Sequence, residues 1–176
     1  YETGYMHNHL RMYVASITCN VAGSHWKNPA KWLYYYLLDA DWGSNALSWQ
    51  WVAGSNSNRK YYANQENINR YCYTNQKNTF LDVDYSKFEN LEIPQNLKET
   101  IEFNIQSFLP KNKSLKIDKE IPTLIYNFYN LDPLWRNNQN SNKILLLEPG
   151  IFQKYPVSKK TIEFIIELSK NIIGIQ

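Results

Sequence analysis

The chain has 176 residues, a net charge of +3 and 43% apolar residues, a composition typical of one globular domain or slightly more. Its longest unbroken apolar run, residues 32–38, is far shorter than the ~20 residues that a bilayer-spanning helix needs. No secretory leader follows Tyr1, and two cysteines are too few for a disulfide framework or a metal cluster. We therefore expect a cytoplasmic protein without a metal or a membrane partner. The weak positive charge neither requires nor excludes a nucleic-acid partner.

The first third of the chain is predicted to be helical. Apolar side chains recur at three- and four-residue steps over residues 3–22, which predicts a helix that Gly23 ends. A second helix is predicted from Asn28, the N-cap before Pro29, to Asp39. The sequence then predicts a polar turn at 41–45, a short helix at 46–53 and a loop at 54–58.

The remainder of the chain changes character along its length. In order, the patterns predict irregular chain with short helical turns at 59–84, an amphipathic helix at 97–109, strands at 122–129 and 143–148, and a helix at 158–172 with Ser158 as its N-cap. A strand, a crossover, a second strand and a helix indicate a parallel pair in an α/β layer. The expected fold class is mainly α, with a helical domain at 1–110, a linker at 111–120 and a small α/β segment at 121–176.

One face of the first predicted helix carries Asn8, Arg11 and Met12, spaced three and four residues apart. If Arg11 is buried it must meet a carboxylate, and Asp39 and Asp41 are the candidates. The alternative is a surface arginine with two solvated acids at a helix end.

Five of the six tryptophans lie within the first 51 residues. The pair Trp49 and Trp51 points two rings in different directions on a helix, which core packing with one exposed ring also explains.

Several uncommon residues fall in register over about fifty positions: Thr3-Gly-Tyr-Met-His-Asn-His-Leu-Arg-Met12, Trp26, Asp39-Ala-Asp-Trp-Gly-Ser-Asn45 and Ser48-Trp-Gln-Trp51. This region resembles the flavin-binding domain of the DNA photolyase and cryptochrome family. The resemblance implies the C-terminal portion of that all-helical FAD-binding domain, and it fades towards residue 90.

The resemblance also implies roles for the residues that match. Arg11 pairs with Asp39 beside the flavin of FAD, Asp41 contacts the polar edge of the ring, and Asn45 faces its N5 atom. A cofactor that changes charge needs such fixed dipoles and a paired carboxylate around it. Trp49 matches the tryptophan nearest the flavin in an electron-transfer chain, and Trp26 matches the middle one.

Other matching positions face DNA that carries a pyrimidine dimer. Trp51 matches a ring that packs on the flipped dimer, and Asn8 and Met12 match positions facing the lesion. Photolyases for the six-four photoproduct carry two histidines at the positions of Asn8 and Met12, so the resemblance disfavours that activity. The segment Asp39-Ala-Asp-Trp42, however, is more similar to the branch that contains the animal cryptochromes and the six-four enzymes. His9 stands where many cyclobutane-type enzymes carry arginine; an exposed helix residue is the alternative for it.

The resemblance implies a light-driven lyase that repairs cyclobutane pyrimidine dimers with FAD. The alternatives are a cryptochrome-like photoreceptor that keeps the flavin but repairs nothing, which His9 favours, and a helical domain that has lost the cofactor. An iron–sulfur cluster needs four thiolates, so Cys19 and Cys72 exclude it, and Cys19 is expected to be a small buried hydrophobe. We further expect that an N-terminal part of the same protein precedes Tyr1 and completes the site, and that residues 1–176 alone are inactive and retain FAD poorly.

Overall fold

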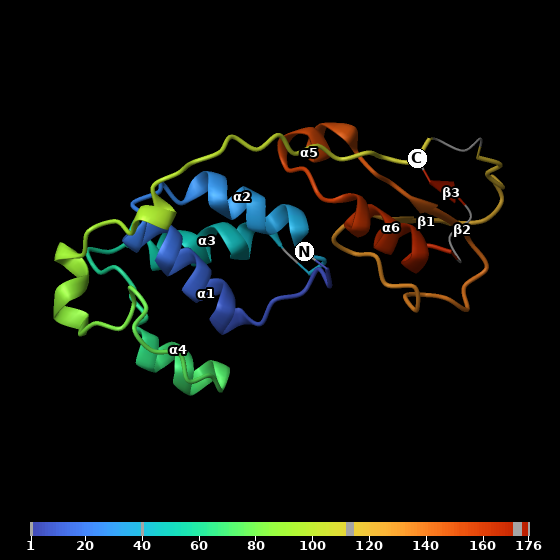
Figure 1. Cartoon of the computed structure of the whole chain (residues 1–176). Helices are drawn as coiled ribbons and strands as arrows, with labels where there is room; N and C mark the ends of the chain where they lie inside the picture. Colours follow the sequence, from blue (N-terminus) through green and yellow to red (C-terminus); the bar gives the residue numbers. More distant parts are fainter. Residues whose placement is uncertain (1, 40, 112–114, 171–173, 176) are drawn as a thin grey trace. The chain divides into compact units, whose positions relative to one another are not determined.

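A computed structural model describes residues 2–39, 41–111, 115–170 and 174–175, and Figure 1 shows its elements in chain order. The chain divides into two compact units, residues 1–104 and 105–176, which are described separately. Helices outnumber strands among the described residues, so the expectation of a mainly α protein is confirmed at this level. None of the described helices is both long and apolar enough to span a bilayer.

The first helix is α1 (Asn8–Ser16), and it runs directly into a π-helical turn, η1 (Ile17–Val21). The predicted start at residue 3 is wrong because Gly4 has a φ of +70° and packs against Leu38. A Cβ atom on Gly4 would lie 2.6 Å from Leu38 Cγ, so only glycine allows this approach. Gly23, with a φ of +72°, ends the helical segment as predicted.

Helices α2 (Lys27–Tyr36) and α3 (Trp42–Val52) follow, and both pack through buried apolar faces. The polar turn predicted at 41–45 is wrong, because these residues form the N-cap and first turn of α3. Asp41 Oδ1 accepts a hydrogen bond from the Ser44 N–H at 2.8 Å, and the Asn45 N–H donates to the Asp41 carbonyl at 3.0 Å. Capping by an aspartate thus starts the helix four residues before the predicted start.

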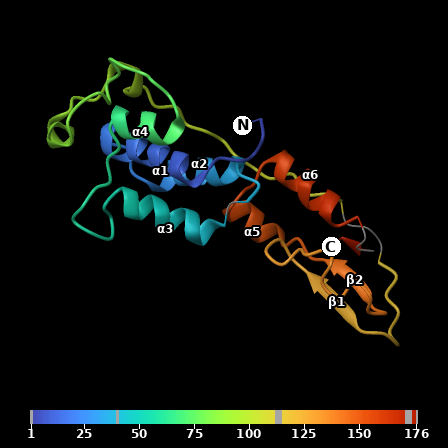
Figure 2. The ribbon, with the colours of Figure 1, turned by 90° about the horizontal axis from the view of Figure 1, so that it is seen from below.

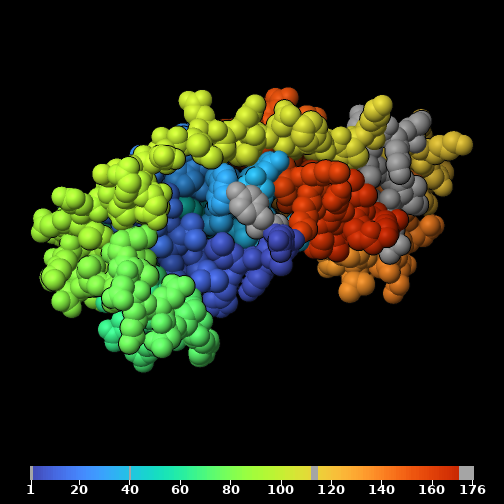
Figure 3. Space-filling view, in the orientation of Figure 1, coloured from blue at the N-terminus to red at the C-terminus, as the bar shows by residue number. Residues whose placement is uncertain are grey.

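Helix α4 (Gln65–Cys72) begins at Asn64, whose Oδ1 accepts from the Asn67 N–H at 3.0 Å. The 3₁₀ turns η2 (Tyr85–Asn90) and η3 (Gln95–Leu97) come later in the first unit. A small apolar cluster of Val21, Leu81 and Phe88 joins these segments to the end of η1. Figure 3 shows α4, in green, on the surface of the unit.

The helix predicted at 97–109 is wrong, because the chain is extended after η3. The apolar face expected for this helix consists of Leu97, Ile101, Ile105 and Phe108, and of these Ile101 and Phe108 are 87% and 64% exposed. Because these two side chains are exposed rather than packed against another element, forming a helix here would bury little apolar surface. The β-branched residues of the segment disfavour a helix further.

The second unit is built on a three-stranded parallel sheet in the order β1-β2-β3. Its strands are β1 (Thr123–Tyr126), β2 (Asn142–Leu145) and β3 (Gly174–Ile175). The predicted parallel pair is confirmed: Leu124 pairs with Lys143 and Tyr126 with Leu145, and Figure 2 shows the two arrows side by side. Both strands are shorter than predicted, since residues 127–129 leave the sheet in a turn.

Two helices accompany this sheet. Helix α6 (Lys159–Leu168) is capped by Ser158 as predicted, with Ser158 Oγ accepting from the Thr161 N–H at 3.2 Å. Ile172, placed in this helix by the sequence, lies outside the described residues. Helix α5 (Pro149–Lys154) was not predicted; Glu148 caps it, and its carboxylate accepts from the N–H groups of Gly150 and Ile151.

Candidate functional site

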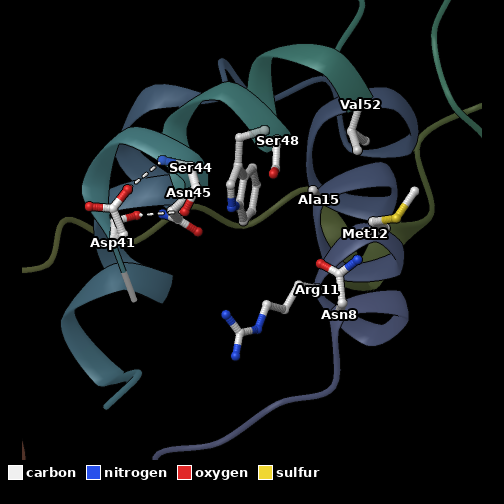
Figure 4. Close-up of a pocket in the computed structure, with 10 residues that line it drawn as sticks. Asn8, Arg11, Met12, Ala15, Asp41, Ser44, Asn45, Ser48 and Val52 are labelled. Carbon is white, nitrogen blue, oxygen red and sulfur yellow. Dashed lines mark hydrogen bonds between the residues drawn. The ribbon is translucent and has the colours of Figure 1, made fainter. Parts of the chain in front are cut away.

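A cavity of about 150 Å³ lies between α1 and α3 in the first unit, and Figure 4 shows the side chains around it. Each helix lines it through positions spaced three and four residues apart, which share one face of a helix. The lining residues are Asn8, Arg11, Met12 and Ala15 of α1, and Asp41, Ser44, Asn45, Ser48, Trp49 and Val52 at the start of α3 and along it. The volume is below the ~300–1,000 Å³ of a typical ligand pocket, so it suits one ring or edge of a ligand.

Arg11 reaches Asp39, as one of the sequence alternatives requires. One guanidinium nitrogen, Nη2, lies 2.8 Å from Asp39 Oδ1 and 2.9 Å from Oδ2. The Nε–H donates to the Met6 carbonyl at 2.6 Å, which holds the guanidinium plane. The side chain of Arg11 is 22% exposed and that of Asp39 is 54% exposed. The pair therefore places a fixed positive charge at the cavity with a half-solvated counter-ion.

Asp41 does not pair with Arg11 in the structure. It is exposed, lines the cavity and caps α3 through its Oδ1 atom. The two aspartates are therefore separated in role: one neutralises a cation, and the other satisfies the N-terminus of a helix.

Asn45 is oriented by a neighbouring helix. Its Nδ2–H donates to the carbonyl of Ala30 in α2 at 2.9 Å, and the residue lines the cavity. Because the amide nitrogen is engaged, Oδ1 remains as the acceptor of this side chain. Such an atom suits a ligand that presents an N–H group.

The two tryptophans assigned to electron transfer differ in position. Trp49 is 2% exposed and lines the cavity. Trp26 is half-buried at the N-cap of α2, outside the cavity lining, and its ring lies 5.7 Å from that of His25.

A second, more open groove adjoins the cavity, and it is lined by Asn8, Met12, Leu47, Ser48, Trp51 and Asn56. Asn8, Met12 and Ser48 line both spaces, so the two lie next to each other along α1 and α3. The structure thus brings together the three residues that the sequence assigned to a DNA lesion, Asn8, Met12 and Trp51. Trp51 is 53% exposed, and its ring lies 5.6 Å from that of Tyr61.

His9 is exposed and lines neither space. Its imidazole ring stacks on the rings of two neighbours, with ring centroids 5.4 Å from that of His7 and 5.5 Å from that of Tyr71. The ring is therefore held in a stack of aromatic rings on the surface, on α1, the helix that carries His9 and also lines both spaces.

Burial perturbs two groups of α1 and η1. Loss of solvation raises the pKa of the Tyr13 hydroxyl to about 12, and it raises the pKa of the Cys19 thiol to about 11. A neutral, buried Cys19 agrees with a packing role. No group of three or more potential metal-ligating side chains occurs in the part of the chain that the structure describes.

Sequence reasoning missed several residues that line the two spaces: Ala15, Ser44, Leu47, Ser48, Val52 and Asn56. A signal was available, because positions 41, 45, 48 and 52 share a helix face, but it needed the correct start of α3.

Comparison with known proteins places the first part of the chain. Residues 1–86 match the family described as "FAD binding domain of DNA photolyase". This part of the chain is similar to that family, and the family's description gives FAD as the ligand of the domain.

Some of the relatives are named photo-lyases and others cryptochromes. The chain is 46% identical over 57 residues to a deoxyribodipyrimidine photo-lyase of Agrobacterium fabrum, covering 32% of this chain and 12% of that protein. A photo-lyase of Buchnera aphidicola is 27% identical over 128 residues, covering 73% and 25%. Cryptochrome-2 of Arabidopsis thaliana is 38% identical over 55 residues, covering 31% and 9%. The chain thus spans a quarter or less of the length of these relatives, and no solved structure matches it with significant similarity.

Proposed function

We propose that this chain contributes to a deoxyribodipyrimidine photo-lyase, a blue-light-driven lyase that uses FAD to repair cyclobutane pyrimidine dimers in DNA. The observation that carries the proposal is that the two spaces adjoin along α1 and α3 and share the lining residues Asn8, Met12 and Ser48. The enclosed cavity fits part of a cofactor, and the open groove beside it fits a flat substrate. A redox cofactor must lie close to the group that it reduces, and this arrangement supports that proximity.

The residues of the enclosed cavity fit the polar edge of a flavin. Arg11 supplies a positive charge whose counter-ion is Asp39. Asn45 supplies its Oδ1 atom, which can accept a hydrogen bond from an N–H group of the ligand because Nδ2 is bonded to the Ala30 carbonyl. Asp41, whose Oδ1 caps α3, supplies a further polar group at the cavity. In the proposal these residues hold FAD, and the domain has the helical fold of the family's FAD-binding domain.

FAD, when bound, supplies a reducing electron to the dimer under blue light. Trp49, buried at the cavity, would donate an electron to keep the cofactor reduced, and Trp26 would in turn reduce the oxidised Trp49. Trp51 packs its exposed ring on the flipped dimer, while Asn8 and Met12 bound the base on the α1 side. His9, on the adjacent surface, faces the DNA backbone.

A cavity of about 150 Å³ holds only part of FAD. We therefore propose that the remaining walls belong to a preceding part of the same polypeptide, since the chain spans a quarter or less of the length of its relatives. On this proposal residues 1–176 by themselves do not retain FAD through gel filtration, and a stoichiometrically yellow preparation would contradict it.

The experiment uses the full-length polypeptide, reconstituted with FAD and mixed with an oligonucleotide that carries one thymine dimer. We expect the dimer to disappear under blue light and to persist in the dark, as measured by chromatography of the digested DNA. A flavin that photoreduces without any loss of dimer would refute repair. A polypeptide with no flavin absorption band would refute cofactor binding as well.

A cryptochrome-like photoreceptor is the second candidate, and His9 favours it. The ring of His9 stacks on its neighbours and lacks the permanent, forked positive charge with which arginine binds a phosphate. The same assay separates the candidates, because the photoreceptor retains light-driven reduction of FAD but does not remove dimers.

A further inference from the structure

The loop after α3 is closed by hydrogen bonds between its two ends. The Tyr61 N–H donates to the Val52 carbonyl at 3.0 Å, so the peptide that ends α3 meets the peptide that follows the loop. Trp51 and Tyr61, whose rings lie 5.6 Å apart with a tilt of 35°, therefore flank this junction.

Asn20 of η1 bridges the same two peptides. Its single amide nitrogen, Nδ2, donates to the Val52 carbonyl at 2.9 Å and to the Tyr61 carbonyl at 2.7 Å. Ser16 Oγ also donates to the Tyr61 carbonyl, at 2.8 Å. The carbonyl of Val52 thus accepts two hydrogen bonds and that of Tyr61 accepts two, which uses both lone pairs of each oxygen.

The other end of the Asn20 amide is unsatisfied. Its Oδ1 atom is buried and has no hydrogen-bond partner among the described residues. A buried acceptor without a partner costs free energy, yet turning the amide over would bring Oδ1 against two carbonyl oxygens. The two bonds from Nδ2 therefore decide the orientation of this side chain.

A π-helical turn places Asn20 at this junction. The Ala22 N–H donates to the Ile17 carbonyl at 2.8 Å, five residues back, so η1 is wider than the α-helical turns before it. Single π-helical turns are rare in proteins, and those that do occur are often found at functional sites.

We propose that Asn20 is a positioning residue that fixes the backbone on both sides of the contact between Trp51 and Tyr61, and so holds Trp51 as a rigid stacking wall of the open groove. The proposal rests on the proposed function for its ligand, an extruded pyrimidine of DNA. Asn20 itself touches no ligand and acts through the backbone of both ring-bearing segments. A wall whose backbone is already fixed binds a flat ligand without the entropy cost of ordering it.

The first test measures the ring of Trp51 directly. The full-length polypeptide is labelled with 5-fluorotryptophan, and Trp51→Phe assigns its ¹⁹F resonance. Asn20→Asp keeps the shape of the side chain but turns an oxygen towards two carbonyls. We expect it to shift the Trp51 resonance towards its position in Tyr61→Ala.

Asn58→Asp is the matched control, because it makes the same chemical change at an exposed position of the same loop. We expect it to leave the Trp51 resonance unchanged. Thermal unfolding verifies that each variant is folded. If Asn20→Asp does not fold, Asn20→Ser decides, since it removes the bridge without introducing charge. A Trp51 resonance unchanged in the folded Asn20 variant overturns the proposal.

The second test measures ligand binding by the FAD-loaded polypeptide. Loss of the bridge should raise the Kd for a thymine-dimer oligonucleotide by about 5-fold, and leave the Kd for undamaged DNA unchanged. Equal weakening for both DNAs would overturn the positioning role. Absence of any dimer affinity in the unsubstituted protein would instead refute the proposed function, while the ¹⁹F result still tests the bridge.

Discussion

The ion pair of Arg11 and Asp39 allows a quantitative test of the cofactor cavity. Replacing Arg11 with Met keeps most of the apolar stem, and replacing Asp39 with Asn keeps the shape of the carboxylate. The Arg11 variant also loses the bond from Nε to the Met6 carbonyl. A double-mutant cycle removes this contribution, because it is lost whether or not Asp39 is present.

The magnitude follows from exposure and geometry. Fully exposed pairs contribute about 0.2–1 kcal/mol, while breaking a buried pair costs about 3–5 kcal/mol. Arg11 is 22% exposed, but Asp39 is 54% exposed and solvent screens it. Contact of Nη2 with both carboxylate oxygens raises the value towards the upper end of the exposed range. We expect a coupling free energy of about 1 kcal/mol.

The assay is urea unfolding followed by tryptophan fluorescence, which reports the first unit because five of the six tryptophans lie there. At 1 M salt the Debye length is about 3 Å, comparable with the 2.8 Å between Nη2 and Oδ1, so part of the coupling should persist. A coupling indistinguishable from zero at low salt would refute the pairing. A value above about 3 kcal/mol would refute the half-solvated description of Asp39.

Two further predictions concern aromatic residues of the first unit. Trp49→Phe should abolish most light-driven reduction of FAD in the full-length protein, as measured by absorbance changes under illumination, and unimpaired reduction would refute the role of Trp49. Its cost in the free energy of unfolding should be about 1–2 kcal/mol, against about 3–5 kcal/mol for Trp49→Ala, as measured by urea unfolding. Burial raises the pKa of Tyr13 to about 12, and its hydroxyl donates to Asn67 Oδ1 at 2.9 Å, so the neutral form is favoured in the folded state. The resulting stability, about 2 kcal/mol, is fully present below pH ~10 and is lost as the pH rises towards 12. Tyr13→Phe should flatten this alkaline decline in urea unfolding, and an unchanged pH dependence would contradict the shift.

Sequence patterns predicted those elements of the fold that bury the side chains forming the pattern. Tyr13 and Val21 of the stripe predicted over residues 3–22 are buried, although Leu10 of the same stripe is 40% exposed, and the Ser158 cap of α6 is hydrogen-bonded as predicted. The stripe at 97–109 has the same periodicity, yet Ile101 and Phe108 stand exposed. Periodicity shows that a face is apolar; whether another element covers it depends on the tertiary structure.

Local hydrogen bonds explain the other differences. Asp41, Gly43 and Ser44 have the composition of a turn, but the carboxylate of Asp41 caps a helix that reaches back to Trp42. No pattern in the sequence indicated the π-helical turn η1, because its Asn20 bonds to residues 32 and 41 positions away. Such long-range partners are invisible to a reading of neighbouring residues.

The candidate site likewise combines residues that the sequence indicated with an arrangement that only the structure reveals. The resemblance named candidate residues within the first 51 positions, and the structure adds that α1 and α3 each contribute one face to two adjoining spaces. The roles assigned to individual residues stay predictions. The arrangement makes them testable, because each cavity has members that the other lacks: Arg11 and Asn45 in one, Trp51 and Asn56 in the other.

The shared wall has a consequence for how the two spaces respond to change. Asn8 and Met12 of α1 and Ser48 of α3 belong to both, so a displacement of α1 against α3 alters both volumes together. Packed helices move as units, because their interiors leave little free volume for side chains to adjust. A substitution that separates these helices should therefore weaken cofactor and substrate binding in parallel. Substitutions at Arg11 or Trp51, which line only one space each, should separate the two effects.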